Sequence, residues 1–332
     1  MRAPIKLGLY TIGLVAIFAA GFTGSRAFMP ADVAAAWTKQ SEAAPQMDHG
    51  ASPSSDASTE SGPAPSAMPG PSVEVPGLSI EQSGYQIRDV AAPVAVGEAG
   101  ILSFRLTGPG GMAVTTYDTL HDKDLHLIVV RSDGAEFRHV HPTNDGDGSW
   151  SIPWRWASAG TYRLFADFVP TDLGSNLTLT STTSVAGDFT PRPLPPDSTI
   201  DTRDDLVVTL DGSVTAGTES MLRFTVTHAG QPVSTLEPYL GAYGHLVALR
   251  AGDLGYLHVH PMGEPGDGVT PPGPDIEFMA AAPTEGTYFL YLDYQLDGKV
   301  HTAEFTVTAA PGSATGHTTT GSQEPAHSDS GH

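Results

Sequence analysis

The chain has no cysteine among its 332 residues. This absence excludes a disulfide framework, thiolate metal sites, cysteine nucleophiles and a lipidated N-terminal cysteine. Basic residues are also scarce, because 16 Lys and Arg stand against 37 Asp and Glu, giving a formal net charge of -21. Nucleic acid and an anionic membrane surface would both repel such a chain, so neither surface is expected as a partner.

Charged residues of both signs make up only 16% of the chain, whereas it holds 37 Gly and 28 Pro. This composition argues against a helical bundle and favours β domains with many turns, joined by flexible segments. Because thiols are absent, any transition-metal site must draw its ligands from the 13 His, the 8 Met and the carboxylates.

The N-terminal region contains an uncharged stretch, LGLYTIGLVAIFAAGFTG, at residues 7–24. A helix of that length spans ~27 Å, close to the ~30 Å of a bilayer's hydrocarbon core. We therefore expect residues 1–28 to form a single transmembrane anchor, with a cleaved signal peptide as the alternative. The anchor predicts a single-pass protein of the cell membrane with its main body extracellular, and cleavage would make the protein secreted.

Two segments have the composition of disordered chain, a tether rich in Ala, Pro and Ser at residues 29–76 and a tail at residues 309–332. Residues 77–188 and 204–308 instead show short runs of β-forming residues, separated by turn signals such as NDGDG and LDG. A Pro-rich connector at residues 189–203 joins these two regions.

The two regions are copies of each other. LHLIVVRSDGAEFRHVHP, which ends at Pro142, aligns without a gap with GHLVALRAGDLGYLHVHP, which ends at Pro261, at a shift of 119 residues. GTYRLFADF at residues 160–168 aligns with GTYFLYLDY at residues 286–294 at a shift of 126. The predicted fold is therefore all-β, with two tandem Ig-like β-sandwich domains that arose by internal duplication.

Each copy retains three histidines in the same spacing, and these six residues are the candidate metal ligands: His126, His139, His141, His245, His258 and His260. Alternate residues of a strand project to the same face, so the two histidines of each HVH motif share a face. If paired residue numbers across the first hairpin add to 267, the first histidine faces the third, within reach of one metal ion. The equivalent sum in the second copy is 505. A slip of one residue would destroy either site.

Three imidazoles without thiolates favour a copper ion, with a zinc ion as the alternative. His121 occurs only in the first copy, and Met262 and His301 occur only in the second, so these three are auxiliary candidates that would make the two sites unequal. For His121 a solvated loop is the competing interpretation. For the triads, the competing interpretation is a network of packed core histidines.

Both copies also retain an arginine and an aspartate. We expect buried structural ion pairs, Arg131 with Asp167 and Arg250 with Asp293, because paired guanidinium and carboxylate groups fix the geometry of neighbouring strands. The sequence contains no GxSxG, HExxH or Walker A motif. No catalytic residue is therefore assigned, and the chain is not expected to be an enzyme.

The anchor, the HDKDLHLIVVRSD and TYRLFADFVP segments, and PYLGAYGHLVALR with YLHVHP together resemble a family of membrane-anchored, exported actinobacterial proteins, some of them labelled as secreted or heavy-metal-binding. The resemblance covers nearly the whole chain and implies a location at the bacterial cell surface. HVHP also resembles the copper motif of copper/zinc superoxide dismutases, but the rest of that ligand pattern and its cysteine pair are missing.

The leading functional hypothesis is an exported, membrane-anchored protein that binds metal ions through two His triads, for buffering, delivery or sensing. The first alternative is a structural or interaction protein of the cell surface whose histidines are core residues. The second is a metal-dependent oxidoreductase or hydrolase, which would need an open coordination position beside a pocket.

Overall fold

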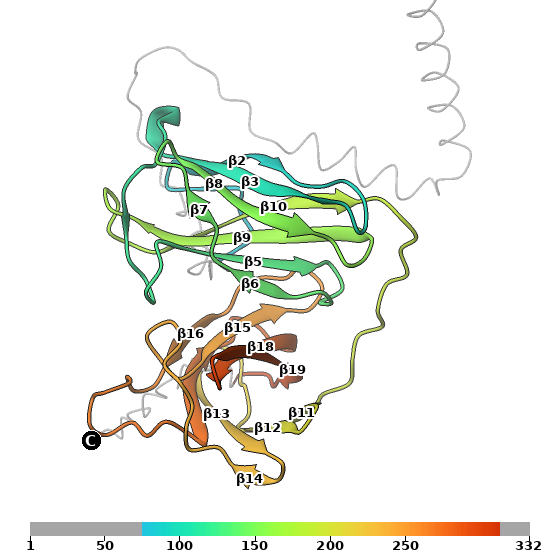
Figure 1. Ribbon diagram of the computed structural model, residues 1–332, viewed down its shortest axis with the longest axis vertical. Helices are drawn as coiled ribbons and strands as arrows, with labels where there is room; N and C mark the ends of the chain where they lie inside the picture. Colours follow the sequence, from blue (N-terminus) through green and yellow to red (C-terminus); the bar gives the residue numbers. More distant parts are fainter. Residues whose placement is uncertain (1–74, 313–332) are drawn as a thin grey trace, which may run out of the picture. The chain divides into compact units, whose positions relative to one another are not determined.

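The computed structural model describes residues 75–312, and the statements below concern that part of the chain. It holds two β-sandwiches, one from each copy, and a short 3-10 helix η1 (Pro109–Gly111) (Figure 1). The predicted all-β fold with two tandem sandwich domains is confirmed. None of the helices in this part is long and apolar enough to cross a membrane. The predicted anchor, all but the last two residues of the tether and all but the start of the tail lie outside the described residues.

The first sandwich consists of two antiparallel sheets. One has the strand order β1-β2-β3-β8-β7. Its strands are β1 (Glu81–Gln82), β2 (Tyr85–Ala91), β3 (Ala99–Thr107), β8 (Ser149–Arg155) and β7 (Thr143–Asn144). The other has the order β10-β9-β5-β6, and β4 pairs with β9. Its strands are β10 (Leu177–Val185), β9 (Gly160–Pro170), β5 (Leu125–Arg131), β6 (Arg138–Val140) and β4 (Tyr117–Asp118).

The second sandwich repeats this plan with one strand displaced. The first of its sheets has the order β11-β12-β13-β17-β16, and β14 pairs with β13. Its strands are β11 (Ile200–Arg203), β12 (Leu206–Asp211), β13 (Glu219–His228), β17 (Asp275–Ala281), β16 (His258–Pro261) and β14 (Gln231–Pro232). The other sheet is β15-β18-β19, formed by β15 (His245–Arg250), β18 (Gly286–Leu296) and β19 (Lys299–Ala309).

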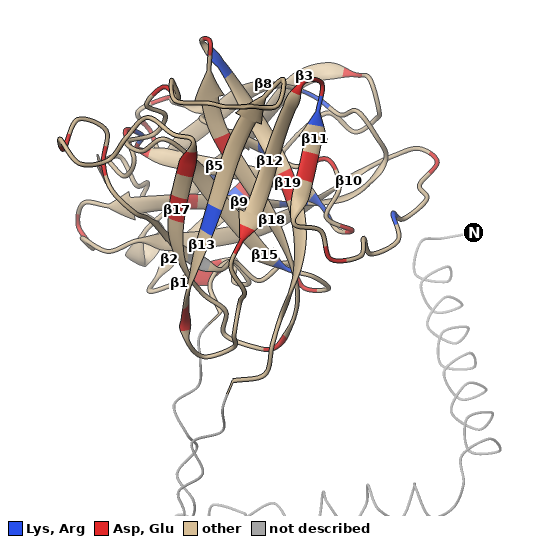
Figure 2. Ribbon diagram, turned by 90° about the horizontal axis from the view of Figure 1, so that it is seen from below, with Lys and Arg blue, Asp and Glu red and all other residues tan. Residues whose placement is uncertain are grey.

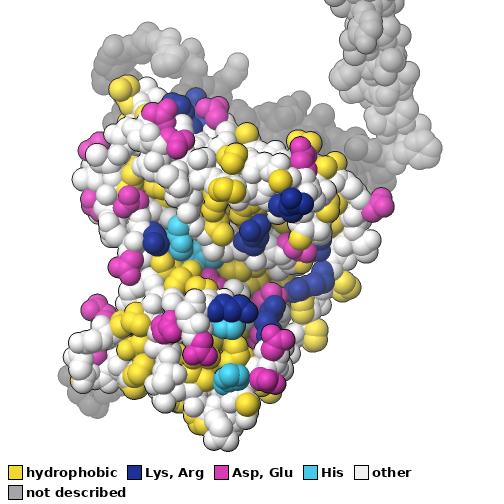
Figure 3. Space-filling view, viewed as in Figure 1, with side chains coloured by type: hydrophobic (Ala, Val, Ile, Leu, Met, Phe, Trp, Pro, Cys, Tyr) yellow, Lys and Arg dark blue, Asp and Glu magenta, His cyan; other side chains and the backbone are white. Residues whose placement is uncertain are grey.

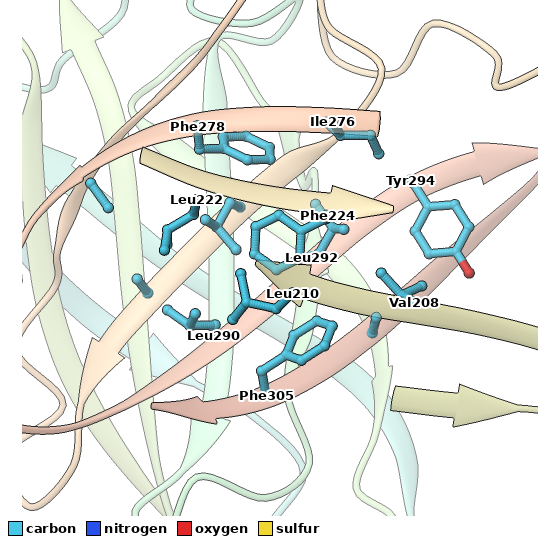
Figure 4. Packing of buried hydrophobic residues seen from close by; sticks show 14 of the residues in the cluster. Val208, Leu210, Leu222, Phe224, Ile276, Phe278, Leu290, Leu292, Tyr294 and Phe305 are labelled. Atoms are coloured by element: carbon cyan, nitrogen blue, oxygen red, sulfur yellow. The ribbon is translucent and has the colours of Figure 1, made fainter. Parts of the chain in front are cut away.

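Each sandwich encloses its own apolar core, because every second residue of a strand points inward. In the second sandwich, Phe224, Phe278 and Phe305 pack on Leu290 and Leu292 between the two sheets (Figure 4). In the first, the equivalent interior is lined by aromatic and aliphatic side chains that include Trp150, Trp154 and Phe168.

The apolar run of β5 is buried on both faces, which is unusual for an antiparallel strand. Its odd-numbered residues, such as Leu127, face the core of the first sandwich. Its even-numbered residues Ile128 and Val130 belong to a separate cluster that also contains Val247 and Phe289 of the second copy. The β5–β9 sheet and the β15–β18 sheet therefore pack against each other through their outer faces.

This contact between the copies is reciprocal. Phe137 stacks on Tyr291 with ring centroids 4.0 Å apart and planes 3° from parallel, and Tyr256 contacts Phe165 at 5.8 Å. The repeat alignment equates Phe137 with Tyr256 and Phe165 with Tyr291. Each copy therefore offers the same pair of positions to the other, as in the isologous interface of a two-fold dimer.

The Pro-rich connector is tied to both sandwiches along its length. The backbone N–H of Arg192 donates to Asp133 in the first copy, and that of Ser198 donates to the carbonyl of Thr306 in the second. Strand β11, inside the predicted connector, is already part of the second sandwich. The sequence holds 37 acidic and 16 basic residues, and Figure 2 shows acidic (red) and basic (blue) positions along the strands and loops.

Candidate metal centre

Three histidines of the first copy converge at the end of the β5–β6 hairpin. The ladder pairs Leu127 with Val140 and Ile128 with His139, so the predicted sum of 267 is confirmed. His126 follows on the same register, and one side-chain nitrogen from each of His126, His139 and His141 lies within 4.8 Å of the others. Only this group of three or more His, Cys or acidic residues within residues 75–312 is close enough to hold a metal ion.

The hydrogen bonds around the triad decide which nitrogens face inward. His126 Nε2 lies 2.9 Å from the carbonyl oxygen of Leu120 and must donate to it, because a carbonyl only accepts. His139 Nδ1 lies 2.9 Å from Oδ2 of Asp293 and donates to that carboxylate. In the neutral rings this leaves His126 Nδ1 and His139 Nε2 without protons, and those two atoms face each other at 3.0 Å. His141 Nε2 lies 3.1 Å from the same His126 nitrogen.

These separations suit ligands of one metal ion. Imidazole nitrogens bind at about 2.0–2.1 Å, so neighbouring ligands are roughly 2.9 Å apart at a right angle and about 3.3 Å apart at the tetrahedral angle. The two measured separations, 3.0 and 3.1 Å, lie between those values. His141 is half-buried, whereas the side chains of His126 and His139 are enclosed, so the triad opens to solvent on the His141 side.

Burial keeps His126 and His141 unprotonated at neutral pH. Loss of solvent lowers the pKa of His126 from 6.5 to about 3, and the neighbouring His139 adds to the effect. Burial likewise lowers the pKa of His141 to about 3, with His139 and Lys123 as further causes. At neutral pH both rings therefore carry free lone pairs, the state in which imidazole binds a metal.

Histidines of both copies surround the triad. The ring of His245 lies 4.7 Å from that of His139 and 5.3 Å from that of His126, centroid to centroid. The ring of His121 lies 5.4 Å from that of His245. A cavity of about 320 Å³ adjoins them and is lined by His121, His245, Asp167 and the exposed His260. Figure 3 shows histidine (cyan) in a few small patches on the face that it draws.

A family model with the description "Domain of unknown function (DUF8832)" matches the chain twice, at residues 80–187 and 201–311. The two matches together cover more than half of the chain. The chain belongs to the DUF8832 family. The two matches confirm the predicted duplication. They bear neither on the His motifs nor on the resemblance to actinobacterial exported proteins. No curated protein matches the sequence.

Solved structures with a similar arrangement include a DUF4426 family protein from Pseudomonas aeruginosa, at 13% identity over 35% of this chain and 99% of that one, with a TM-score of 0.24. A chimeric titin Z1Z2 tandem matches at 14% identity over 69% and 99%, with a TM-score of 0.19. The D0–D1 domain of intimin matches at 10% identity over 68% and 97%, with a TM-score of 0.21. The scores are too low to carry any functional argument.

The second DUF8832 copy does not repeat the triad's hairpin. Its ladder starts on the predicted sum of 505, with a bridge between Leu249 and Tyr256 and a bond from the Leu257 N–H to the Ala248 carbonyl. The next residues leave β15, and β16 pairs with β17 of the other sheet, so that His260 lies opposite Met279 rather than His245. The predicted pairing of His245 with His260 is therefore wrong. His245 instead lies beside the first triad.

Of the auxiliary candidates, only His121 joins the cluster in this DUF8832 chain. It occupies a tight turn with φ of 48°, closed by the bridge between Leu120 and Lys123. Met262 is exposed and lines a different cavity. His301 stacks on Tyr294 at the opposite face of the β18–β19 sheet from Asp293. The structure brings neither Met262 nor His301 to the triad.

The predicted pairs of Arg131 with Asp167 and of Arg250 with Asp293 are wrong. Arg131 binds Asp133 through two hydrogen bonds of 2.8 and 2.9 Å, and Arg250 binds Asp253 in the same way. The β5–β9 ladder places Tyr162 opposite Arg131, while Asp167 lies opposite His126 at the other end. Within β9, Asp167 also points to the outer face of the sheet with Phe165, whereas Arg131 lies on the inner face.

The two aspartates are instead the cross-strand partners of the first histidine in each copy. Asp167 faces His126 in one ladder, and Asp293 faces His245 in the other. Each accepts a hydrogen bond from a threonine on the next strand, Thr178 and Thr302 respectively. Sequence reasoning missed this role, although both aspartates had been found retained with the histidines. The retention of both aspartates together with the histidines was the signal in the sequence, but the predicted partners were arginines rather than histidines.

Proposed function

We propose that this DUF8832 protein binds a divalent transition-metal ion, copper in preference to zinc, through His126, His139 and His141. The observation that carries the proposal is the approach of His126 Nδ1 and His139 Nε2 to 3.0 Å, because in neutral rings the bonds to Leu120 and Asp293 leave these two nitrogens without protons. Two lone pairs that face each other repel unless a cation lies between them. Because burial drives the pKa of His126 to about 3, His126 itself does not hold a proton in that position at neutral pH, whereas a metal ion can bind both nitrogens.

Copper is the preferred ion because nitrogen sites bind divalent metals most tightly at copper, and this site has no thiolate. The chain's acidic surface attracts cations of any kind and so raises the rate at which metal ions associate with it. The triad determines which metal ion is bound. Together with the apolar stretch at residues 7–24, these features support an exported, membrane-anchored protein for metal buffering, delivery or sensing. The proposed activity is binding, with no catalytic step.

The test is a titration of the full chain with Cu(II) and Zn(II), compared with the His126→Ala, His139→Ala and His141→Ala variants. We expect one tight site per chain, with affinity for copper above that for zinc, and a loss of at least 100-fold in each variant. His301→Ala is the matched control, because His301 is also half-buried on a strand but lies away from the triad. Histidines outside residues 75–312 contribute equally to all of these proteins, so they cancel in the comparison.

The alternative is that the triad is a packed polar network that joins the two copies, as part of a structural or interaction protein. The bond from His139 to Asp293 across the copies favours this second function. It predicts that His139→Ala lowers the thermal midpoint of the chain by the same amount with and without metal. If the wild type gains no stability from Cu(II) or Zn(II) and binds neither ion tightly, the metal proposal is wrong and the structural function stands.

A further inference from the structure

We infer that the metal centre is assembled from both copies, with Asp293 of the second copy as the residue that positions His139 of the first. Metal binding and the docking of one copy on the other are then coupled. This inference rests on the proposed function, because it concerns the regulation of the same site. It adds a residue outside the ligand set and a consequence for the contact between the two sandwiches.

Asp293 is held in place before it meets the histidine. Its carboxylate is buried in β18, and Oδ1 accepts the hydroxyl hydrogen of Thr302 on β19. This leaves Oδ2 to accept the N–H of His139, on a side chain that solvent does not reach. A histidine that donates one ring nitrogen to a carboxylate presents the other as a bare, more basic ligand atom. Asp293 therefore selects the tautomer that can bind metal.

In the opposite half of the interface, the equivalent aspartate of the first copy accepts hydrogen bonds from residues of its own copy. Asp167 is the equivalent of Asp293, but Oδ1 of Asp167 accepts from Thr178 and Asn176, both of its own copy. The strand that would bring the equivalent of His139 to the hairpin is β16, and β16 pairs with β17 instead. Among the described side chains, the two-fold relation between the copies thus yields one assembled centre, and it provides a matched control residue for Asp293.

All three proposed ligands lie in the first copy, whereas the residue that orients one of them lies in the second. A metal ion that binds the oriented triad more tightly must, by linkage, stabilise the docked arrangement by the same factor. The docked surface is the cluster around Ile128, Val247 and Phe289, together with the bond from the Tyr291 hydroxyl to the Gly134 carbonyl. Metal is therefore expected to protect β18 from exchange, although β18 supplies no ligand.

The experiment compares the full chain with its Asp293→Asn and Asp293→Ala variants, and with the matched controls Asp167→Asn and Asp167→Ala. Cu(II) affinity is measured by competition with a chelator. We expect a 10- to 100-fold loss for the Asp293 variants, larger for Ala than for Asn, and a change below 3-fold for the Asp167 variants. If the Asp293 variants do not fold, Thr302→Val replaces them, and Thr178→Val is its control. Thr302→Val is then expected to lower the Cu(II) affinity as well.

Two further measurements separate positioning from a merely structural role. Nitrogen NMR of the metal-free chain should show His139 protonated at Nδ1, and this signature should be lost in Asp293→Ala. Hydrogen exchange should show that Cu(II) slows exchange in β18 of the wild type and of Asp167→Ala, but not of Asp293→Ala.

The outcomes distinguish the two proposals. If the wild type binds no metal, the proposed function fails and this inference fails with it. If the wild type binds Cu(II) and Asp293→Ala binds it equally tightly with an unchanged His139 tautomer, only this inference is overturned. Metal binding that leaves exchange in β18 unaltered also overturns the coupling, while the triad itself stands.

Discussion

The buried histidines make the metal-free protein sensitive to mild acid, and the sign of the effect follows from their pKa values. The pKa of His126 is about 3 in the folded chain, because of burial, against 6.5 for an exposed histidine. Below pH 6.5 the unfolded chain takes up a proton at this position and the folded chain does not. The free energy of unfolding is therefore undiminished above pH 6.5 and falls as the pH drops toward 3.

The expected size follows from the same two values. Between pH 6.5 and 4.5, His126 alone reduces the free energy of unfolding by roughly 2 kcal/mol, or a little over ~1 kcal/mol for each pH unit. His141 has the same shift but is half-buried, so solvent screening reduces its share. Carboxylates whose pKa is lowered, such as Asp133 and Asp253, lose their stabilising contribution only below about pH 4. The pKa of Asp167 is instead raised by burial, so the difference between the wild type and a His126 variant, rather than the window alone, isolates His126.

The assay is urea unfolding of the metal-free chain at several pH values within that window. His126→Asn is expected to flatten the dependence by about one proton, whatever it does to the stability itself. His228→Asn is the control, because His228 is an exposed histidine at the end of β13. Bound Cu(II) should shift the wild-type acid transition to lower pH by competing with protons. An unchanged slope in His126→Asn would refute the assignment of a buried, neutral His126.

Three further outcomes test the packing. A double-mutant cycle between Arg131 and Asp133 should give a coupling free energy of ~1 kcal/mol or more, and the same cycle between Arg131 and Asp167 should give none, in urea unfolding. Tyr291→Phe removes the hydroxyl bond between the copies but keeps the ring that stacks on Phe137, and it should cost ~1 kcal/mol in the same assay. Phe224→Ala opens a cavity in the second sandwich and should destabilise it by ~3–5 kcal/mol in thermal unfolding.

The hairpin of the first copy could be predicted because local features determine it. A short turn joins two strands, and once the turn is placed, the pairing of every later residue follows. The second copy has nearly the same turn and begins on the same register at Leu249 and Tyr256. The second copy leaves this register where β16 pairs with the longer strand β17 of the other sheet. The stretch between β16 and β17 is also longer than its counterpart in the first copy. The sequence of the hairpin alone does not show that β17 competes with β15 for pairing with β16.

The cross-strand neighbour of Asp167 could not be predicted from the sequence for a different reason. The run LIVV at residues 127–130 is apolar at four consecutive positions, so alternation does not reveal which face of β5 meets the sandwich core. With the faces unassigned, Arg131 and Asp167 looked compatible, although they lie on opposite faces and at opposite ends of the ladder. The comparison of the copies does not identify Asp133 as the partner of Arg131, because the repeat alignment places Gly252 at its position. In the second copy Asp253 pairs with the arginine instead.

The asymmetry of the centre is a consequence of having both copies in one chain. Two identical subunits related by a two-fold axis must build both of their equivalent half-sites or neither. Here the copies share the docking positions, Phe137 with Tyr291 and Tyr256 with Phe165, so the two-fold contact is retained. Once fused, they are free to differ in one edge strand, and β16 does differ. A stoichiometry of one metal ion, rather than two, is therefore the result that this geometry demands of the proposed centre.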